Sequence, residues 1–340
     1  MEGSPVHCTV DLDAAGKQFG RLEVPRSTNT SGWSHLFVPI VIISSGDGPT
    51  VLVLGGVHGD EPEGQVAALN LVRETMPSDV SGRLVVIPCA SPDASAANTR
   101  LWPSGTNFNR SFPGSPDGAV DAQLADFLTR FLIAEADVVV DMHSGGRSSL
   151  FGVWSEMHWV DDPEQRRRMV AAMLAWNTPM HFVYIDVAGT GLLVGEAERQ
   201  GKTVVATELG GGGHVLASTH RIAIDGLRNV LRHVGVLAGE ARTREELGLA
   251  PPVIARATDD DNYVFAPEAG YWETLVDVGD RVDAGQPVGR LHFVATPERP
   301  PVTVEAAAAG VVCVVRAIPI AEQGDNLIVI GREIGLSELA

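Results

Sequence analysis

Residues 50–237 alternate between short apolar runs and longer amphipathic runs, and this alternation limits the possible folds more than any other feature of the chain. The short runs are TVLVLGG, RLVVIPCA, ADVVVDMHSGG and KTVVATELGGGG. The longer runs, with apolar residues at helical spacing, are EGQVAALNLVRETM, AVDAQLADFLTRFLIAE, EQRRRMVAAMLAWN and HRIAIDGLRNVLRHVGVL. Continuous apolar strands that alternate with amphipathic helices are typical of a sheet covered on both faces. We therefore expect an α/β fold with a mixed, mostly parallel sheet and helices on both of its faces.

The pattern changes near residue 250. The stretch LGLAPPVIARATDDDN is rich in proline and aspartate, and we interpret it as a linker. Short strand-like runs separated by glycine turns follow it, which indicates a small all-β, barrel-sandwich-like domain. We place one domain at 1–250, with strands such as RLEVP and HLFVPIVII near its start, and the β domain at 257–340. No lysine follows Lys202, so the β domain is not a carrier that is modified on lysine.

Charge and cysteine content exclude several classes of protein. The net charge of −18 gives a surface that repels nucleic acid and anionic membranes. The three cysteines lie far apart and form no CxxC, which argues against a disulfide framework and a cysteine zinc site. No stretch reaches the roughly 18 apolar residues of a membrane span, and the N-terminus does not resemble a signal peptide. We expect a cytoplasmic homo-oligomer, with the β domain as a candidate interface and neither nucleic acid nor membrane as a partner.

Three apolar strands end in ionisable residues that are followed by glycines. The first releases His58 and Glu61 in VHGDEPEG, the second His143 in DMHSGG, and the third Glu208 in TELGGGG. Ligands bind at the carboxyl ends of the strands in such sheets, so we expect these four side chains to converge. Two histidines and a glutamate with an open fourth position form a ligand set of catalytic zinc, which activates water and polarises carbonyl groups. This pattern predicts one Zn²⁺ per chain on the first three, and Glu208 as general base and acid.

Each of these motifs alone has an ordinary explanation. An H-x-x-E pair is most often a surface coincidence, His143 could be a hydrogen-bonded core histidine, and Glu208 could pair locally. Asp60 is interpreted as a helix N-terminal charge or a support for a metal ligand, and Glu63 as solvated. It is the combination at three strand ends that favours a metal centre.

A polar loop at residues 98–118, NTRLWPSGTNFNRSFPGSPDG, is long for a connection in a compact domain, and such loops are often functional. It carries Arg100, Asn109 and Arg110. Arginine is suited to hold a carboxylate by two parallel hydrogen bonds, so Arg110 and Arg100 are candidate substrate ligands, and Arg147 is a further candidate. The alternative is surface arginines that pair with some of the many acids of the chain.

HGDEPEG, NFNRSFPG, DMHSGG and TELGGGG together resemble the succinylglutamate desuccinylase/aspartoacylase family, a branch of the zinc carboxypeptidase superfamily, over about residues 45–235. The resemblance implies a zinc-carboxypeptidase-like fold, zinc on His58, Glu61 and His143, and Glu208 as the base. It also implies that Asn109 and Arg110 contact the substrate, with Arg100 as a carboxylate ligand. Such enzymes cleave an N-acyl amino acid into a carboxylate and an amino acid.

Within the family, the motifs look most like the Nα-acetyl-L-2,4-diaminobutyrate deacetylase branch of ectoine degradation. Two departures bear on specificity. Pro62 stands where that branch usually has a tyrosine, and residues 101–106 form a shorter loop that lacks the charges expected there. Both segments are expected close to the substrate.

The sequence therefore favours a zinc amidohydrolase that deacylates an N-acyl amino acid, with N-acetyl-diaminobutyrate as the leading substrate type. One alternative is a desuccinylase or aspartoacylase with another N-acyl substrate, and a second is a zinc carboxypeptidase that acts on peptides. A third, from another class, is a non-catalytic binding protein that uses the acidic cleft.

Overall fold

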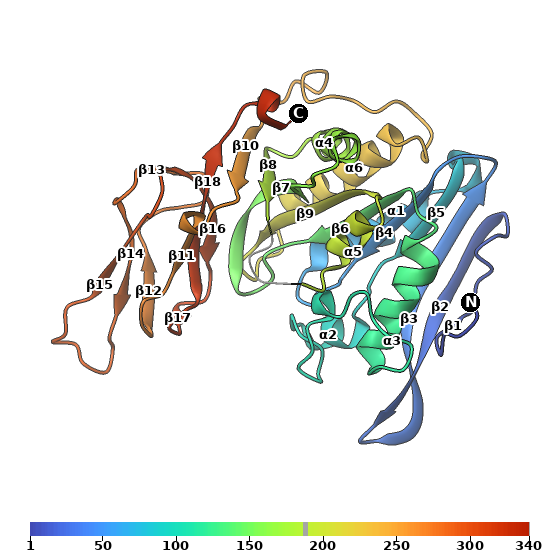
Figure 1. Cartoon of the computed structure of the whole chain (residues 1–340), viewed down its shortest axis with the longest axis horizontal. Coiled ribbons are helices and arrows are strands. Elements are labelled where there is room, and N and C mark those ends of the chain that lie inside the picture. Colours follow the sequence, from blue (N-terminus) through green and yellow to red (C-terminus); the bar gives the residue numbers. More distant parts are fainter. Residues whose placement is uncertain (186–189, 340) are drawn as a thin grey trace.

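A computed structural model describes residues 1–185 and 190–339 (Figure 1). The α-helices are α1 (Pro62–Glu74), α2 (Pro92–Ala97), α3 (Val120–Phe127), α4 (Pro163–Ala175), α5 (Leu193–Arg199) and α6 (Ala217–His233). The strands before residue 250 are β1 (His7–Cys8), β2 (Gly16–Thr28), β3 (Ser31–Ser45), β4 (Thr50–Gly55), β5 (Gly82–Ile87), β6 (Val138–His143), β7 (Ser149–His158), β8 (Met180–Tyr184) and β9 (Thr203–Gly211). Those after it are β10 (Val253–Ala257), β11 (Tyr263–Phe265), β12 (Gly270–Thr274), β13 (Arg281–Val282), β14 (Pro287–His292), β15 (Val302–Glu305), β16 (Gly310–Arg316), β17 (Ile320–Ala321) and β18 (Asn326–Glu333).

Most of the strands join one mixed sheet. Within the described residues its order is β1-β2-β3-β5-β4-β6-β9-β7-β8-β10-β18-β16-β13, with β11 beside β18. The pairs β5–β4, β4–β6 and β6–β9 are parallel, as are β7–β8 and β8–β10, whereas the flanking pairs and β9–β7 are antiparallel. The α/β class is confirmed, but the expected parallel arrangement holds only for these inner pairs.

Helices form two groups, one on each face of the sheet (Figure 1). Helices α1, α4 and α6 pack against one another and against the inner strands, while α3 and α5 form a second group with the π-helical turn that follows α3. The inner strands are apolar throughout because both of their faces are covered: every residue from Val51 to Leu54 of β4 is fully buried. None of the helices in the described ranges has the length and apolar character that crossing a bilayer needs.

The C-terminal strands continue the same sheet. Strand β10, in the stretch expected as a linker, pairs with β8 on one side and with β18 on the other. Strand β16 pairs with β18 and also with β7, so β7, β8, β10, β18 and β16 form a ring. Apolar side chains of these strands, among them Trp154, Phe182 and Val329, share one buried cluster. This ring draws strands from both sides of residue 250, and the division at 1–250 and 257–340 stays a prediction.

A second sheet, of order β15-β14-β12-β17, packs on the C-terminal end of the first. Residues of both sheets, such as Trp272 and Leu291 from one and Val312 and Ile328 from the other, form a separate apolar core. The C-terminal β region is therefore confirmed, while the expected self-contained barrel-sandwich is not, because part of this region closes a ring with strands from before residue 250.

Candidate metal centre and substrate cavity

The register of the inner strands brings three functional side chains into line. His143 at the end of β6 is paired with Glu208 on β9, which is in turn paired with Trp154 on β7. Paired residues of neighbouring strands point to the same face of a sheet. The strand ends that the sequence singled out therefore meet on one face, as predicted for His143 and Glu208.

His58 and Glu61 come from the loop between β4 and α1, and close packing brings this loop to His143. Pro62 begins α1, where its missing N–H costs no hydrogen bond. A Cβ atom on Gly64 would lie 2.5 Å from the Cβ of Met142, so only glycine lets the first turn of α1 approach the end of β6 this closely. The loop and the strand end are held together by backbone contact.

His58, Glu61 and His143 form a buried cluster whose ligand atoms all lie within 4.8 Å of one another. The Nδ1 atom of His58 lies 2.8 Å from Glu61 Oε1, and the Nδ1 atom of His143 lies 2.8 Å from Glu61 Oε2. Arg100 reaches the same point, and its Nη1 donates to Glu61 Oε1 at 3.2 Å. The three predicted ligands are therefore brought together.

The second ring nitrogen of each histidine faces a fixed oxygen. His143 Nε2 lies 3.0 Å from Asp141 Oδ2, and His58 Nε2 lies 3.2 Å from Asn107 Oδ1. Metal-binding histidines usually use one ring nitrogen for the metal and donate from the other to such an oxygen, which sets the tautomer. Two Nδ1 atoms and a carboxylate thus point inward with their orientation already determined, and this donor set fits a divalent ion such as zinc.

Charges within the cluster shift the pKa values of its members. Burial opposes the ionisation of Glu61, but the two adjacent histidines outweigh it and hold the pKa of Glu61 well below its usual range. Burial also opposes the charging of His143, yet Asp141 and Glu61 together raise its pKa well above the ordinary value. For His58, burial prevails and lowers the pKa. The site concentrates negative charge around the two imidazoles, which favours a bound cation.

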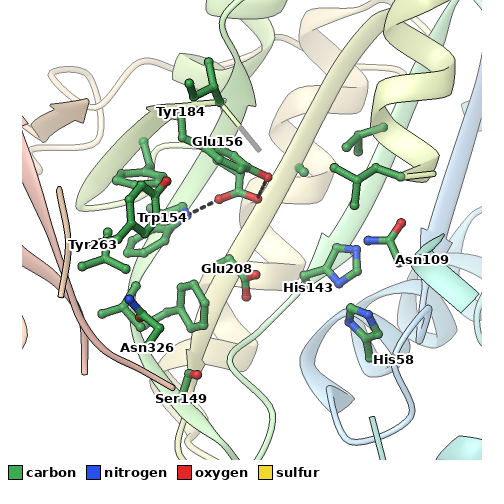
Figure 2. Close-up of a pocket in the computed structure, with 18 of the residues that line it drawn as sticks. His58, Asn109, His143, Ser149, Trp154, Glu156, Tyr184, Glu208, Tyr263 and Asn326 are labelled. Carbon is green, nitrogen blue, oxygen red and sulfur yellow. Dashed lines mark hydrogen bonds between the residues drawn. The ribbon is translucent and has the colours of Figure 1, made fainter. Parts of the chain in front are cut away.

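Glu208 opens onto the cavity beside the two histidines (Figure 2). Its Oε2 atom is buried and has no hydrogen-bond partner among the described residues. Burial, followed by the negative charges of Glu61 and Glu156, raises the pKa of Glu208 well above that of an ordinary carboxyl group. An unpartnered carboxyl with a raised pKa beside a candidate metal site is suited to accept a proton and return it.

The cavity has a volume of about 350 Å³, a size suited to a small molecule. One side is lined by His58, His143 and Asn109 (Figure 2), together with Arg100, which contacts His58, and Arg110, which contacts the Asn109 carbonyl. The other side is walled by residues of the strand ring, including Tyr263, Val314, Asn326 and Val329 from the C-terminal region. Figure 2 shows Glu208 between the histidines on one side and Tyr263 and Asn326 on the other. The C-terminal region therefore completes the cavity.

The candidate substrate ligands do not all lie in this cavity. Asn109 is buried at its edge, and its Oδ1 accepts the Leu193 N–H at 3.0 Å, which ties the loop to α5. Arg110 Nη1 donates to the Asn109 carbonyl at 2.7 Å. Arg147 lines a different cavity, together with Asp60, and the backbone N–H of Arg147 donates to Asp60 Oδ2 at 3.1 Å.

The expectation that Pro62 and residues 101–106 lie close to the substrate stays a prediction, whereas the expectation for Glu63 is wrong. Pro62 lines the same second cavity as Arg147 and does not line the first. No residue of 101–106 lines the first cavity either, and Trp102 turns inward, where its Nε1 donates to Ser91 Oγ at 2.7 Å. Glu63, expected to be solvated, is only 1% exposed. The two departures from the related branch therefore lie outside the wall of the candidate site.

Sequence reasoning missed several residues of the site. Asp141 could have been found from the D-x-H spacing, because alternate residues of a strand share a face. Glu156 could have been found in the same way from W-S-E, had β7 been recognised as a strand. Asn107 lies in the polar loop at residues 98–118, and no role was predicted for it. Tyr263 and Asn326 carry no local signal, because only the pairing of distant strands brings them to the cavity.

Comparisons with known proteins agree with this architecture. The family model of the succinylglutamate desuccinylase/aspartoacylase catalytic domain matches residues 47–234. The chain is 37% identical over 328 residues to the N-alpha-acetyl-L-2,4-diaminobutyric acid deacetylase of Halomonas elongata, which covers 96% of this chain and 95% of that protein. The product-bound structure of the ectoine utilization protein EutE (DoeB) from Ruegeria pomeroyi is similar with a TM-score of 0.92 and 37% identity, over 97% of this chain and 99% of that one. A succinylglutamate desuccinylase/aspartoacylase structure from Rhodobacter sphaeroides has a TM-score of 0.92 and 36% identity, over 98% and 100% of the two chains.

Proposed function

The chain belongs to the succinylglutamate desuccinylase/aspartoacylase family, and we propose that it is a zinc-dependent amidohydrolase that removes the acyl group from an N-acyl amino acid. The leading substrate type is Nα-acetyl-L-2,4-diaminobutyrate. This choice is supported by the relative from Halomonas elongata, which is named as a deacetylase of that compound. The single observation that carries the proposal is the convergence of His58, Glu61 and His143 beside Glu208 in one cavity.

In this proposal His58 Nδ1, the Glu61 carboxylate and His143 Nδ1 would hold one Zn²⁺. Zinc supplies the acidification of a water molecule and the polarisation of the acyl carbonyl. Asp141 and Asn107 hold the outer nitrogens of the two imidazoles and so keep the inner nitrogens aimed at the ion. The role of the protein is thus to orient the ligands before the ion binds.

Glu208 moves the proton. Hydrolysis forms a C–O bond to the acyl carbon, breaks the C–N bond, and needs a proton taken from water and one given to the leaving amine. A single carboxyl group performs both transfers if its pKa lies near the working pH. The raised pKa of Glu208 supports this role, because it makes the carboxylate a stronger base towards the water molecule than a carboxylate of ordinary pKa.

Arg110 and Arg100 are proposed to hold the substrate carboxylate, with Asn109 positioning the loop that carries them. Arg100 contacts Glu61 and His58 in the structure, so binding of the ion would leave its guanidinium available to an anionic ligand. Arg147 remains a weaker candidate, since it lines the neighbouring cavity. A homo-oligomeric state and a cytoplasmic location remain predictions.

A panel of substrates tests the proposal. The zinc-loaded protein is assayed with N-acetyl-diaminobutyrate, N-acetyl-aspartate, N-succinyl-glutamate and short peptides, with a chelator-treated sample as the control. We expect hydrolysis of at least one N-acyl amino acid, its loss with chelator, and much slower cleavage of peptides, since the cavity of about 350 Å³ suits a small amide. Efficient peptide cleavage alone would favour a carboxypeptidase, and no hydrolysis at all would favour a binding protein.

A further inference from the structure

A second buried carboxylate, Glu156, lines the same cavity, and so far it has only been described as one of the charges that raise the pKa of Glu208. It is 5% exposed and lies on β7, two positions after Trp154, so the two side chains share a face. The register places Ala206 beside it on β9 and Phe182 beside it on β8. It therefore stands at the aromatic end of the cavity.

Within the part of the chain that the structure describes, the hydrogen-bond donors to Glu156 are neutral groups. Its Oε2 accepts from Trp154 Nε1 at 2.6 Å, and its Oε1 accepts from the Tyr184 hydroxyl at 3.3 Å (Figure 2). Across residues 1–185 and 190–339, no arginine or lysine forms an ion pair with it. A buried carboxylate without a cation is costly, whereas one that receives a cationic ligand is neutralised when the ligand binds.

Glu156 lies beside a stack of aromatic rings. Trp154 and Phe182 stack with centroids 4.7 Å apart, and Phe182 and Tyr184 stack at 5.5 Å. Trp154 and Tyr184 meet the carboxylate with the indole N–H and the hydroxyl, at the edges of their rings. These two donors fix the carboxylate in the wall of the cavity, where its negative charge can form a strong hydrogen bond with a cationic ligand.

The charges of the cavity are therefore separated. Arg100 contacts His58 and Arg110 contacts the Asn109 carbonyl, so both arginines lie on the histidine side of the cavity. Glu156 lies away from them, beside Trp154 and Tyr184 (Figure 2). A ligand with a carboxylate at one end and an ammonium group at the other would match this distribution, whereas a second carboxylate in the position of the ammonium group would be repelled.

We propose that Glu156, held in place by Trp154 and Tyr184, forms the subsite for the free ammonium group of a diamino acid substrate. This inference rests on the proposed deacylase function and adds to it the residue that binds the amine. It assigns a specificity-determining role to strand β7, on which Glu156 lies.

Binding of two matched product-like ligands tests the subsite without relying on catalysis. L-2,4-diaminobutyrate and L-norvaline have the same number of heavy atoms and differ in an ammonium group against a methyl group. Calorimetric titration of the zinc-loaded protein is expected to give on the order of 10- to 100-fold tighter binding of diaminobutyrate, the range of a charged hydrogen bond. In Glu156→Gln the ratio of the two affinities should fall to about one. The control is Glu196→Gln, which changes a buried glutamate on α5 outside the cavity and should leave the ratio as in the wild type.

Equal affinity of the wild type for the two ligands would overturn the subsite, whether or not the variant folds, and so would a ratio that Glu156→Gln leaves unchanged. The acetylated forms of both ligands are assayed in parallel. If neither is hydrolysed but the ligand preference is present, the deacylase proposal fails and the subsite stands. If both are hydrolysed equally well and no preference is found, the deacylase proposal stands and the subsite fails.

Discussion

Replacing Glu208 with glutamine separates the proton transfer from metal binding. The substitution keeps the size of the side chain but removes its ability to take and return a proton. The Glu208 side chain forms no hydrogen bond with any of the described residues, and its Oε2 is buried. The glutamine amide therefore loses no hydrogen bond that the carboxylate makes there. We therefore expect the free energy of unfolding at low pH to change by less than about 1 kcal/mol.

The catalytic effect should be large by comparison. General acid–base catalysis by a positioned side chain contributes about 10²- to 10⁴-fold, which corresponds to ~3–5 kcal/mol of the barrier. We expect kcat for the best N-acyl amino acid to fall by this factor in Glu208→Gln while the zinc content stays at the wild-type level. Glu208→Asp, which keeps a carboxyl group at shorter reach, should retain more activity than the glutamine variant.

The same variant has a pH signature in the metal-free protein. The raised pKa of Glu208 means that the native state keeps this proton to higher pH than the unfolded chain does. The native state then binds more protons in that window, so its free energy of unfolding falls as the pH rises through it. Glu208→Gln should lack this contribution in denaturant titrations. A variant with wild-type activity, or one that loses zinc together with activity, would refute the assignment of Glu208 as the base.

Three further predictions test the supports of the site and the fold. Asp141→Asn should weaken zinc binding by about 10- to 100-fold in a chelator competition, because His143 loses the carboxylate that orients it. An unchanged zinc affinity would show that Asp141 does not orient His143 for the metal. Gly211→Ala should lower the free energy of unfolding by about 2 kcal/mol or more, because Gly211 has φ +121° and an added Cβ would lie 2.5 Å from the Ser149 carbonyl oxygen. A variant as stable as the wild type would contradict this close approach. Burial, with the charge of Arg244 added, lowers the pKa of His181 to about 3. Below the ordinary value of 6.5 the native state therefore binds fewer protons than the unfolded chain, and the free energy of unfolding should fall as the pH drops from 6.5 toward 3. His181→Gln should show a shallower fall in acid denaturation.

The inner strands and the strand-end residues were predictable because their signals are local. A strand buried on both faces must be apolar along its whole length, so ionisable residues at its end stand out against it. His143 and Glu208 were found in this way, and their pairing across β6 and β9 follows from the parallel order of the strands. The H-x-x-E spacing added His58 and Glu61, whose shared orientation depends on the turn into α1.

The aromatic end of the cavity was not predictable in the same way. Strand β7 faces the cavity with polar as well as apolar residues, so SLFGVWSEMH does not appear as a continuous apolar run, and Glu156 went unnoticed. Strand β10 lies in a segment whose proline and aspartate content suggested a linker. The ring that brings Tyr263 and Asn326 to the cavity depends on pairings between strands more than 100 residues apart, such as β7 with β16, and no local pattern encodes them.

The most direct test of the whole account measures zinc and hydrolysis together in the wild type and in Glu61→Gln. Elemental analysis after dialysis, paired with an assay on the best N-acyl amino acid, gives both values from one preparation. We predict one zinc per wild-type chain and the loss of both zinc and activity in Glu61→Gln, because this variant lacks the inward-facing carboxylate between His58 and His143. A Glu61→Gln protein that binds a full equivalent of zinc and hydrolyses the substrate at the wild-type rate would contradict it.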